Sequence, residues 1–243
     1  MAEFSGWNGL EKSYRIWIPK RFHEYNNSKR YEAMNMEVLK IFDEHGSQIG
    51  TSTRKEAHEK GYWHETFQVY FIDGNQRNRS IYLQKRSHLK KDFPNLFDMT
   101  VAGHLMEQET VREGVREIEE EVGIAVKYDE LTYLGTFQNI IKIDRMIDKE
   151  FSHVYLYECE KPMESFILQP EEVEGIAKVS VKDLISFYTG KCSQMTAEGF
   201  IVDKGGKKVR HKQSLTKADF VPHAEDYFQA VANAISDYLS EEC

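Results

Sequence analysis

Residues 103–124 of this 243-residue chain read GHLMEQETVREGVREIEEEVGI. Thr110 and Glu113, three positions apart, form the pattern of a capping box, which marks the start of a helix. Gly123 suits the left-handed position that ends a helix. We therefore predict a short loop at the start of this stretch, followed by a helix from Thr110 to about Val122.

The predicted helix has one apolar face and one acidic face. At about 100° per residue, four apolar residues share one stripe, which we expect to be buried: Val111, Val115, Ile118 and Val122. Four acidic residues gather on nearly the opposite side: Glu117, Glu120 and Glu121, with Glu113 beside them. Like charges at helical spacing repel by about 0.2–0.5 kcal/mol per pair. A bound cation would explain the cluster, and carboxylates suit Mg²⁺ or Mn²⁺; a simply solvated face is the alternative.

The whole stretch resembles the Nudix box, G-x5-E-x7-R-E-U-x-E-E-x-G-U, in which U is aliphatic. The matching residues are Gly103, Glu109, Arg116, Glu117, Ile118, Glu120, Glu121, Gly123 and Ile124. Two departures are visible. Six residues rather than seven separate Glu109 from Arg116, and Gln108 stands where many members have glycine. Neither departure changes the register of the acidic face.

The remaining sequence predicts an α+β fold. Strand patterns cover residues 36–42, 62–72, 80–85, 131–141, 150–158 and 176–181, and helix patterns cover 182–188 and 222–239. Residues 190–219 are polar and rich in lysine, and are predicted to be a loop. Strands interrupted by a few helices imply a sheet with helices on its faces. This agrees with the α/β/α sandwich with a mixed sheet that the resemblance implies.

We predict three parts of the chain: an N-terminal extension (1–35), a Nudix domain (36–189) and a C-terminal loop and helix packing on it (190–243). The extension is too aromatic for a disordered tail. We expect it to pack on the main domain or on a second subunit, which would make the protein a homodimer.

Composition excludes several classes of function. A formal net charge of −8 argues against general nucleic-acid binding, and no apolar run is long enough to predict a membrane span. The first residues do not follow the plan of a secretory signal. Three distant cysteines, Cys159, Cys192 and Cys243, indicate neither a disulfide framework nor a CxxC metal site. We therefore expect a cytoplasmic protein with reduced thiols.

A second resemblance covers residues 37–181, and it is to type I isopentenyl-diphosphate isomerases and their Nudix hydrolase relatives. It is carried by Ile49-Gly50-Thr51, Ala57-His58, His64, Leu83-Gln84-Lys85-Arg86, Lys90-Lys91, Phe93-Pro94 and Ala102-Gly103-His104. In the isomerases three histidines and two glutamates hold a second metal. The resemblance implies that the corresponding residues here are His58, His64, His104, Asp148 and Glu150. Imidazole with carboxylate suits Mn²⁺ or Zn²⁺.

Ala102 separates this chain from the isomerases. They need a cysteine at this position to move a proton to or from carbon, and alanine has no titratable group. Glu150 alone cannot replace an acid/base pair. Because the box itself is complete at Arg116-Glu117 and Glu120-Glu121, the resemblance favours a hydrolase with isomerase-like architecture. An isomerase, or a binding module without turnover, remains the alternative.

The predicted reaction is hydrolysis of a nucleoside diphosphate linked to another moiety, or of another organic diphosphate. Glu117, Glu120 and Glu121 would hold Mg²⁺ or Mn²⁺, so that bound water can attack phosphorus. Arg116 would orient Glu117 or Glu109. Three residues are assigned to the substrate: Arg86, Lys90 and Gly103. The base is left open among Glu120, Glu121 and Glu150.

Overall fold

The computed structural model describes residues 37–74, 78–144 and 146–241. The predicted N-terminal extension and the dimer contact assigned to it lie outside these residues. The strands are β1 (Val38–Phe42), β2 (Gln48–Thr53), β3 (Trp63–Asp73), β4 (Ser80–Arg86), β5 (Phe97–Asp98), β6 (Val101–His104), β7 (Leu131–Ile143), β8 (Met146–Glu158), β9 (Val173–Ser180), β10 (Gln194–Val202) and β11 (Lys208–Thr216). The α-helices are α2 (Arg54–Lys60), α3 (Arg116–Val122), α4 (Val181–Tyr188) and α5 (Glu225–Glu241).

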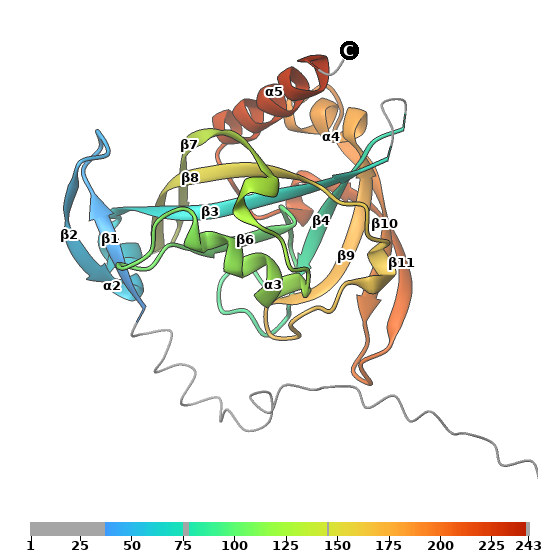
Figure 1. The fold of residues 1–243 in the computed structure, drawn as a ribbon, viewed down its shortest axis with the longest axis horizontal. Helices are drawn as coiled ribbons and strands as arrows, with labels where there is room; N and C mark the ends of the chain where they lie inside the picture. Colours follow the sequence, from blue (N-terminus) through green and yellow to red (C-terminus); the bar gives the residue numbers. More distant parts are fainter. Residues whose placement is uncertain (1–36, 75–77, 145, 242–243) are drawn as a thin grey trace, which may run out of the picture.

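The long strand β3 organises the sheet (Figure 1). It pairs antiparallel with β6 along one edge, which sets Thr66 opposite His104. It pairs parallel with β8 along the other edge, which sets His64 opposite Glu150. The sheet is therefore mixed, as predicted. The register brings residues from three separate parts of the chain to the same end of β3.

Helices cover both faces of the sheet, which confirms the predicted sandwich (Figure 1). Phe67, Val69 and Phe71 of β3 pack in one cluster with Ile118 and Val122 of α3. The alternate β3 residues Tyr70 and Ile72 belong to the opposite cluster, with the apolar residues of α4 and α5. Side chains alternate between the faces of a strand, so β3 contributes to both layers of the core.

The predicted loop at residues 190–219 is wrong, because β10 and β11 form a hairpin there. β10 also pairs with β9, so the sheet continues across the boundary predicted after residue 189. The inward residues Met195, Ala197 and Leu215 are buried in the core. β11 is an edge strand and carries the exposed cations Arg210 and Lys212, and such charge protects a sheet edge from pairing with other chains.

The box helix begins later than predicted. A 3₁₀ turn over Glu113–Val115 precedes α3, whose first residue is Arg116. The Glu113 carboxylate accepts a hydrogen bond from the backbone N–H of Thr110 at 2.8 Å, which is half of the predicted capping box. The helix ends as predicted at Gly123, whose φ of 69° lies in the left-handed region. No helix among the described residues is both long and apolar enough to cross a membrane.

Candidate active site

A cleft of about 430 Å³ lies where α3 faces the end of β3, β6 and β8. It gathers nine of the predicted site residues: Arg86, Lys90, Gly103, His104, Arg116, Glu117, Glu120, Glu121 and Glu150. His58 and His64 lie beside it, in contact with His104. The fold therefore brings all eleven predicted site residues to one region.

The three metal-binding glutamates predicted on α3 do not share one exposed face. Glu120 is exposed, with 54% of its side chain accessible. Glu121 is only 4% exposed. Its carboxylate accepts hydrogen bonds from Gln84 Nε2 and from the backbone N–H of Ala102, both at 3.3 Å. Glu121 precedes Val122 of the buried stripe and faces the sheet, so the expectation that it lies on the solvent side is corrected.

Burial disfavours the ionised form of the two inner carboxyls, Glu117 and Glu121. Desolvation raises the pKa of Glu117 to about 7; the charge of Glu120 adds to the shift and Arg116 opposes it. Desolvation also raises the pKa of Glu121 well above its ordinary range, with a further contribution from Glu117. Two neighbouring buried carboxyls disfavour ionisation unless positive charge is close. A bound divalent cation would provide such a charge and favour the ionised form of both carboxyls.

Arg116 links the glutamates of the box. Its Nε and Nη2 donate to the two carboxylate oxygens of Glu109, the second at 3.0 Å. Its Nη1 lies 2.7 Å from Glu117 Oε1 and 3.2 Å from Glu120 Oε2. The fork geometry of arginine suits such two-point contacts. The missing residue between Glu109 and Arg116 therefore does not prevent the contact between them.

Gly103 leaves room for the side chain of Glu117. A Cβ atom at this position would lie 2.1 Å from Cδ of Glu117 and 2.2 Å from its Oε1. No larger residue fits without displacing Glu117. Gly103 also lines the cleft, as its predicted substrate contact requires, but making room for Glu117 already explains the glycine.

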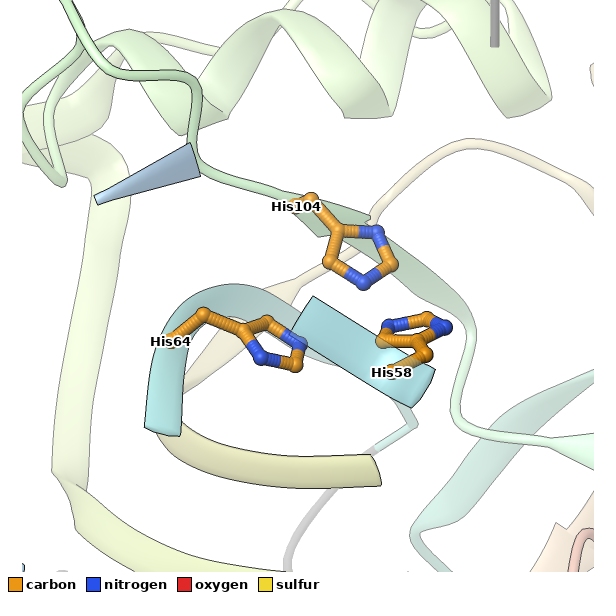
Figure 2. A group of neighbouring side chains, drawn as sticks. All are labelled: His58, His64 and His104. Carbon is orange, nitrogen blue, oxygen red and sulfur yellow. The ribbon is translucent and has the colours of Figure 1, made fainter. Parts of the chain in front are cut away.

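Three histidines form a second donor group next to the glutamates (Figure 2). They come from different elements: His58 from α2, His64 from β3 and His104 from β6. Their ring centroids lie 5.1 to 5.4 Å apart, and the rings turn toward a common point (Figure 2). The backbone carbonyl of Tyr62 lies 3.0 Å from His64 Nδ1, which directs the lone pair to Nε2.

The atoms that point into this group have no hydrogen-bond partner. They are the Nε2 atoms of the three histidines and Oδ1 of Asp148, all buried. Asp148 Oδ1 lies 3.3 Å from His64 Nε2 and 3.6 Å from His58 Nε2. Desolvation lowers the pKa of His58 to about 4 and that of His104 well below its usual range. Asp148 instead raises the pKa of His64, although burial opposes the shift. Imidazoles and a carboxylate with unsatisfied lone pairs are metal ligands, so these residues fit a bound cation.

Glu150 joins the histidine group from β8. Donor atoms of His64, Asp148 and Glu150 all lie within 4.8 Å of one another. Burial raises the pKa of Glu150 to about 6, and the charge of Asp148 adds to the shift. Gln68 and Asn139 donate to its carboxylate at 3.2 and 3.3 Å. Neither amide was identified from the sequence, because only strand pairing brings them to Glu150.

Basic side chains line another part of the cleft. Arg86 donates to the backbone carbonyls of Asp92 and Phe93 at 3.0 and 3.2 Å, and Lys90 forms an ion pair with Glu172. Arg54, at the start of α2, also lines the cleft but was not identified from the sequence. Its position one helical turn before His58 is the signal that could have identified it.

The chain is similar to known proteins over much of its length. The NUDIX domain family matches residues 62–194. The chain is 41% identical over 204 residues to an uncharacterized Nudix hydrolase of Clostridium acetobutylicum, covering 84% of this chain and 99% of that protein. It is 33% identical over 150 residues to an isopentenyl-diphosphate Delta-isomerase of Aliivibrio fischeri, covering 61% of this chain and 82% of that protein.

A crystal structure of a Deinococcus radiodurans protein has a TM-score of 0.47 to this chain at 20% identity, covering 62% of this chain and 87% of the other. The family match spans more than half of the chain, and the clostridial relative is covered almost completely. The chain therefore belongs to the Nudix hydrolase family.

Proposed function

We propose that this protein hydrolyses the diphosphate bond of an organic diphosphate, such as a nucleoside diphosphate linked to another moiety, with Mg²⁺ or Mn²⁺ as cofactor. The observation that carries the proposal is the composition of the cleft. Glu117, Glu120 and Glu121 line it together with basic residues from other elements, Arg54, Arg86 and Lys90. A metal–diphosphate complex needs both kinds of group, because cations and phosphate oxygens must be bound side by side.

Two donor sets fit divalent cations. Glu117, Glu120 and Glu121 offer hard carboxylate oxygens, which suit Mg²⁺. The imidazole group of His58, His64 and His104 offers unpartnered nitrogen atoms, which suit Mn²⁺. When bound, a divalent cation neutralises charge on the diphosphate and lowers the pKa of a coordinated water.

The protein's own residues have separate tasks in this proposal. Arg116 holds Glu109, Glu117 and Glu120 in a fixed arrangement through its hydrogen bonds and ion pairs. Arg86 and Lys90 bind the phosphate oxygens by charge-assisted hydrogen bonds. Lys90 must then exchange its present partner, Glu172, for the substrate.

The base that removes a proton from water is Glu120, Glu121 or Glu150. A base works best when its pKa lies near the working pH. The pKa of Glu150, raised to about 6, meets this condition. The carboxyl of Glu121, whose pKa lies well above the ordinary range, would have to lose its proton first.

The isomerase remains the second candidate, because the histidine group and the Aliivibrio fischeri relative both favour it. Isomerisation moves a proton onto one carbon and off another, so it needs two titratable groups. Ala102 lines the cleft but has none. A binding module without turnover is the third candidate, and the full set of box glutamates argues against it.

The test is product release from a panel of organic diphosphates with Mg²⁺ or Mn²⁺. The proposal is supported if at least one compound is hydrolysed, if this hydrolysis requires the metal, and if Glu117→Gln abolishes it. Arg112→Gln is the matched control, since Arg112 is exposed and pairs with Asp129. Solvent proton exchange into isopentenyl diphosphate would instead identify an isomerase, and binding without reaction would identify a binding module.

A further inference from the structure

The carboxylate of Glu150 is held by one of its two oxygens. Gln68 Nε2, Asn139 Nδ2 and Ser152 Oγ all donate to Oε2, at 3.2, 3.3 and 3.1 Å. Among the hydrogen bonds between the described side chains, none reaches Oε1. The polar partners are almost fully buried. These three hydrogen bonds fix the orientation of the Glu150 carboxylate through Oε2 and leave Oε1 for a ligand in the cleft.

Both amides must point their nitrogen atoms at Glu150, because a carboxylate repels an amide oxygen. Two neighbours impose this orientation. The Tyr227 hydroxyl donates to Gln68 Oε1. The backbone N–H of Ala224 donates to Asn139 Oδ1 at 3.2 Å. A backbone N–H has no acceptor role, so the Asn139 amide cannot turn over without losing this bond.

His223 completes the support on the Asn139 side. Its Nδ1 lies 2.9 Å from Asn139 Nδ2 and therefore accepts. Its Nε2 then carries the proton and donates to Asp98 Oδ1 at 2.9 Å. The other oxygen of Asp98 lies 3.5 Å from Nη1 of Arg86. One imidazole thus connects Glu150, through Asn139, with the basic residue Arg86, through Asp98.

These supporting groups come from the region where α5 begins, at residues 223–227, beyond the residues that match the NUDIX domain family. Tyr227 and the side chain of His223 are buried, at 1% and 5% exposure. Tyr227 also packs in the apolar core under α5. A test must therefore separate a role in the site from a role in stability.

We propose that His223 and Tyr227 are positioning residues of the active site. The hydroxyl of Tyr227 acts on Glu150 through the amide of Gln68, while its ring packs against His223 with centroids 5.0 Å apart. His223 acts on Glu150 through Asn139 and on Arg86 through Asp98. This inference rests on the proposed function and deepens it, because it makes the C-terminal helix a working part of the hydrolytic site.

The two routes predict different kinetics for the full-length protein. Tyr227→Phe removes the hydroxyl that fixes the Gln68 amide and should lower kcat about tenfold, which corresponds to about 1.4 kcal/mol, with KM within about twofold. His223→Ala should lower kcat by a similar factor and also raise KM about fivefold, since it loosens the support of Arg86 as well. Tyr238→Phe is the matched control, because its hydroxyl also comes from α5 but bonds Glu158, which does not line the cleft.

A double-mutant cycle identifies the route. If Tyr227 acts through Gln68, Tyr227→Phe should have little further effect on kcat in a Gln68→Ala background. An undiminished effect there, or an unchanged kcat in both Tyr227→Phe and His223→Ala, overturns the positioning role while the hydrolase activity of the wild type stands. Assays run well below the melting temperature of each variant remove the contribution of stability.

Mn²⁺ titration followed by electron paramagnetic resonance tests the same proposal without turnover. Tyr227→Phe should bind Mn²⁺ about tenfold more weakly than the wild type, since residues that support metal ligands typically contribute about 10–100-fold; Tyr238→Phe should not. If no diphosphate is hydrolysed by the wild type, the proposed function fails and this titration still decides the positioning role. Equal Mn²⁺ affinity in Tyr227→Phe, His223→Ala and the wild type overturns it.

Discussion

The two donor groups of the cleft are built in opposite ways. Glu117, Glu120 and Glu121 come from adjacent turns of one helix and range from exposed to buried. The three histidines come from α2, β3 and β6 and aim unpartnered nitrogens at one another. The first group concentrates negative charge. In the second, burial lowers the pKa of His58 and His104, whereas Asp148 raises the pKa of His64. In the proposed function, this difference favours Mg²⁺ at the carboxylates and a softer cation such as Mn²⁺ at the histidines.

The largest expected effect is on turnover through the acidic group. Glu120→Gln keeps the shape of an exposed side chain but removes its charge, so the fold should be unaffected. Mg²⁺-dependent turnover should fall about 10²–10⁴-fold, as expected for loss of a metal-binding or proton-accepting carboxylate. Steady-state hydrolysis measures this. Glu113→Gln is the control, because Glu113 lies nearby on the same segment and bonds only Thr110 among the contacts described; equal losses in both variants would contradict the assignment.

The acidic group could be predicted from one stretch of sequence because helical geometry is local. Gly123 ended the helix as expected, and Arg116 reached Glu117 and Glu109. The burial of Glu121 could not be predicted, since it depends on donors from β4 and β6 that pair with β3 and β9 far away in sequence. The sequence period alone assigns a residue to a side of the helix, not to the partner it will meet.

The histidine group shows the opposite limit. Its residues could be named only through resemblance, because the register of β3 with β6 and β8 brings them together. His58 depends on α2, a helix that the sequence pattern did not predict. The hairpin of β10 and β11 was missed for a related reason. Its lysine-rich composition suggested a loop, although alternate residues such as Met195 and Ala197 are buried.

The second prediction concerns stability and the sign of its pH dependence. The pKa of Glu117 rises on folding from its ordinary 4.5 to about 7. Above pH 7 the folded protein must bury this charge, which destabilises it; below about pH 4.5 the carboxyl is protonated in both states and the penalty disappears. In the presence of a chelator, Glu117→Gln should therefore be about 3 kcal/mol more stable than the wild type at pH 8 and equal near pH 4.

Urea unfolding across this pH range measures the difference, and added Mg²⁺ should reduce it at pH 8 by stabilising the wild type.

The contribution of His58 to stability should depend on pH with the opposite sign. Its pKa falls on folding from 6.5 to about 4, so its contribution to stability is present above pH 6.5 and is lost as the pH falls toward 4. The wild type should then lose stability relative to His58→Gln over that range. A pH-independent difference for either variant would contradict the account of that group.

The third prediction separates the metals of the two groups. His104→Gln removes one of the unpartnered nitrogens and should weaken Mn²⁺ binding at the histidine site by at least about tenfold, since even residues that only support ligands contribute that much. Calorimetric titration with Mn²⁺ and with Mg²⁺ measures both affinities. Mg²⁺ binding to the glutamates of α3 should change by less than about threefold. Loss of both metals together would mean that the two groups form a single site. His211→Gln is the control, since His211 lies on β11, outside the cleft.

The smallest expected effect is that of changing Arg54. This residue lines the cleft and belongs to α2, the helix that also carries His58. Its guanidinium already has acidic neighbours, Glu37 at 3.3 Å and Asp92 at 3.9 Å. Because these carboxylates already partly neutralise its charge, its net contribution to diphosphate binding is smaller than that of an arginine without acidic neighbours. Arg54→Gln should raise KM about fivefold with little change in kcat, which corresponds to about 1 kcal/mol of binding.

Lys55→Gln is the matched control, since Lys55 follows in the same helix but is exposed and lies 3.9 Å from Glu59. Equal KM values for Arg54→Gln and Lys55→Gln would assign Arg54 to the structure of α2 and leave substrate binding to Arg86 and Lys90.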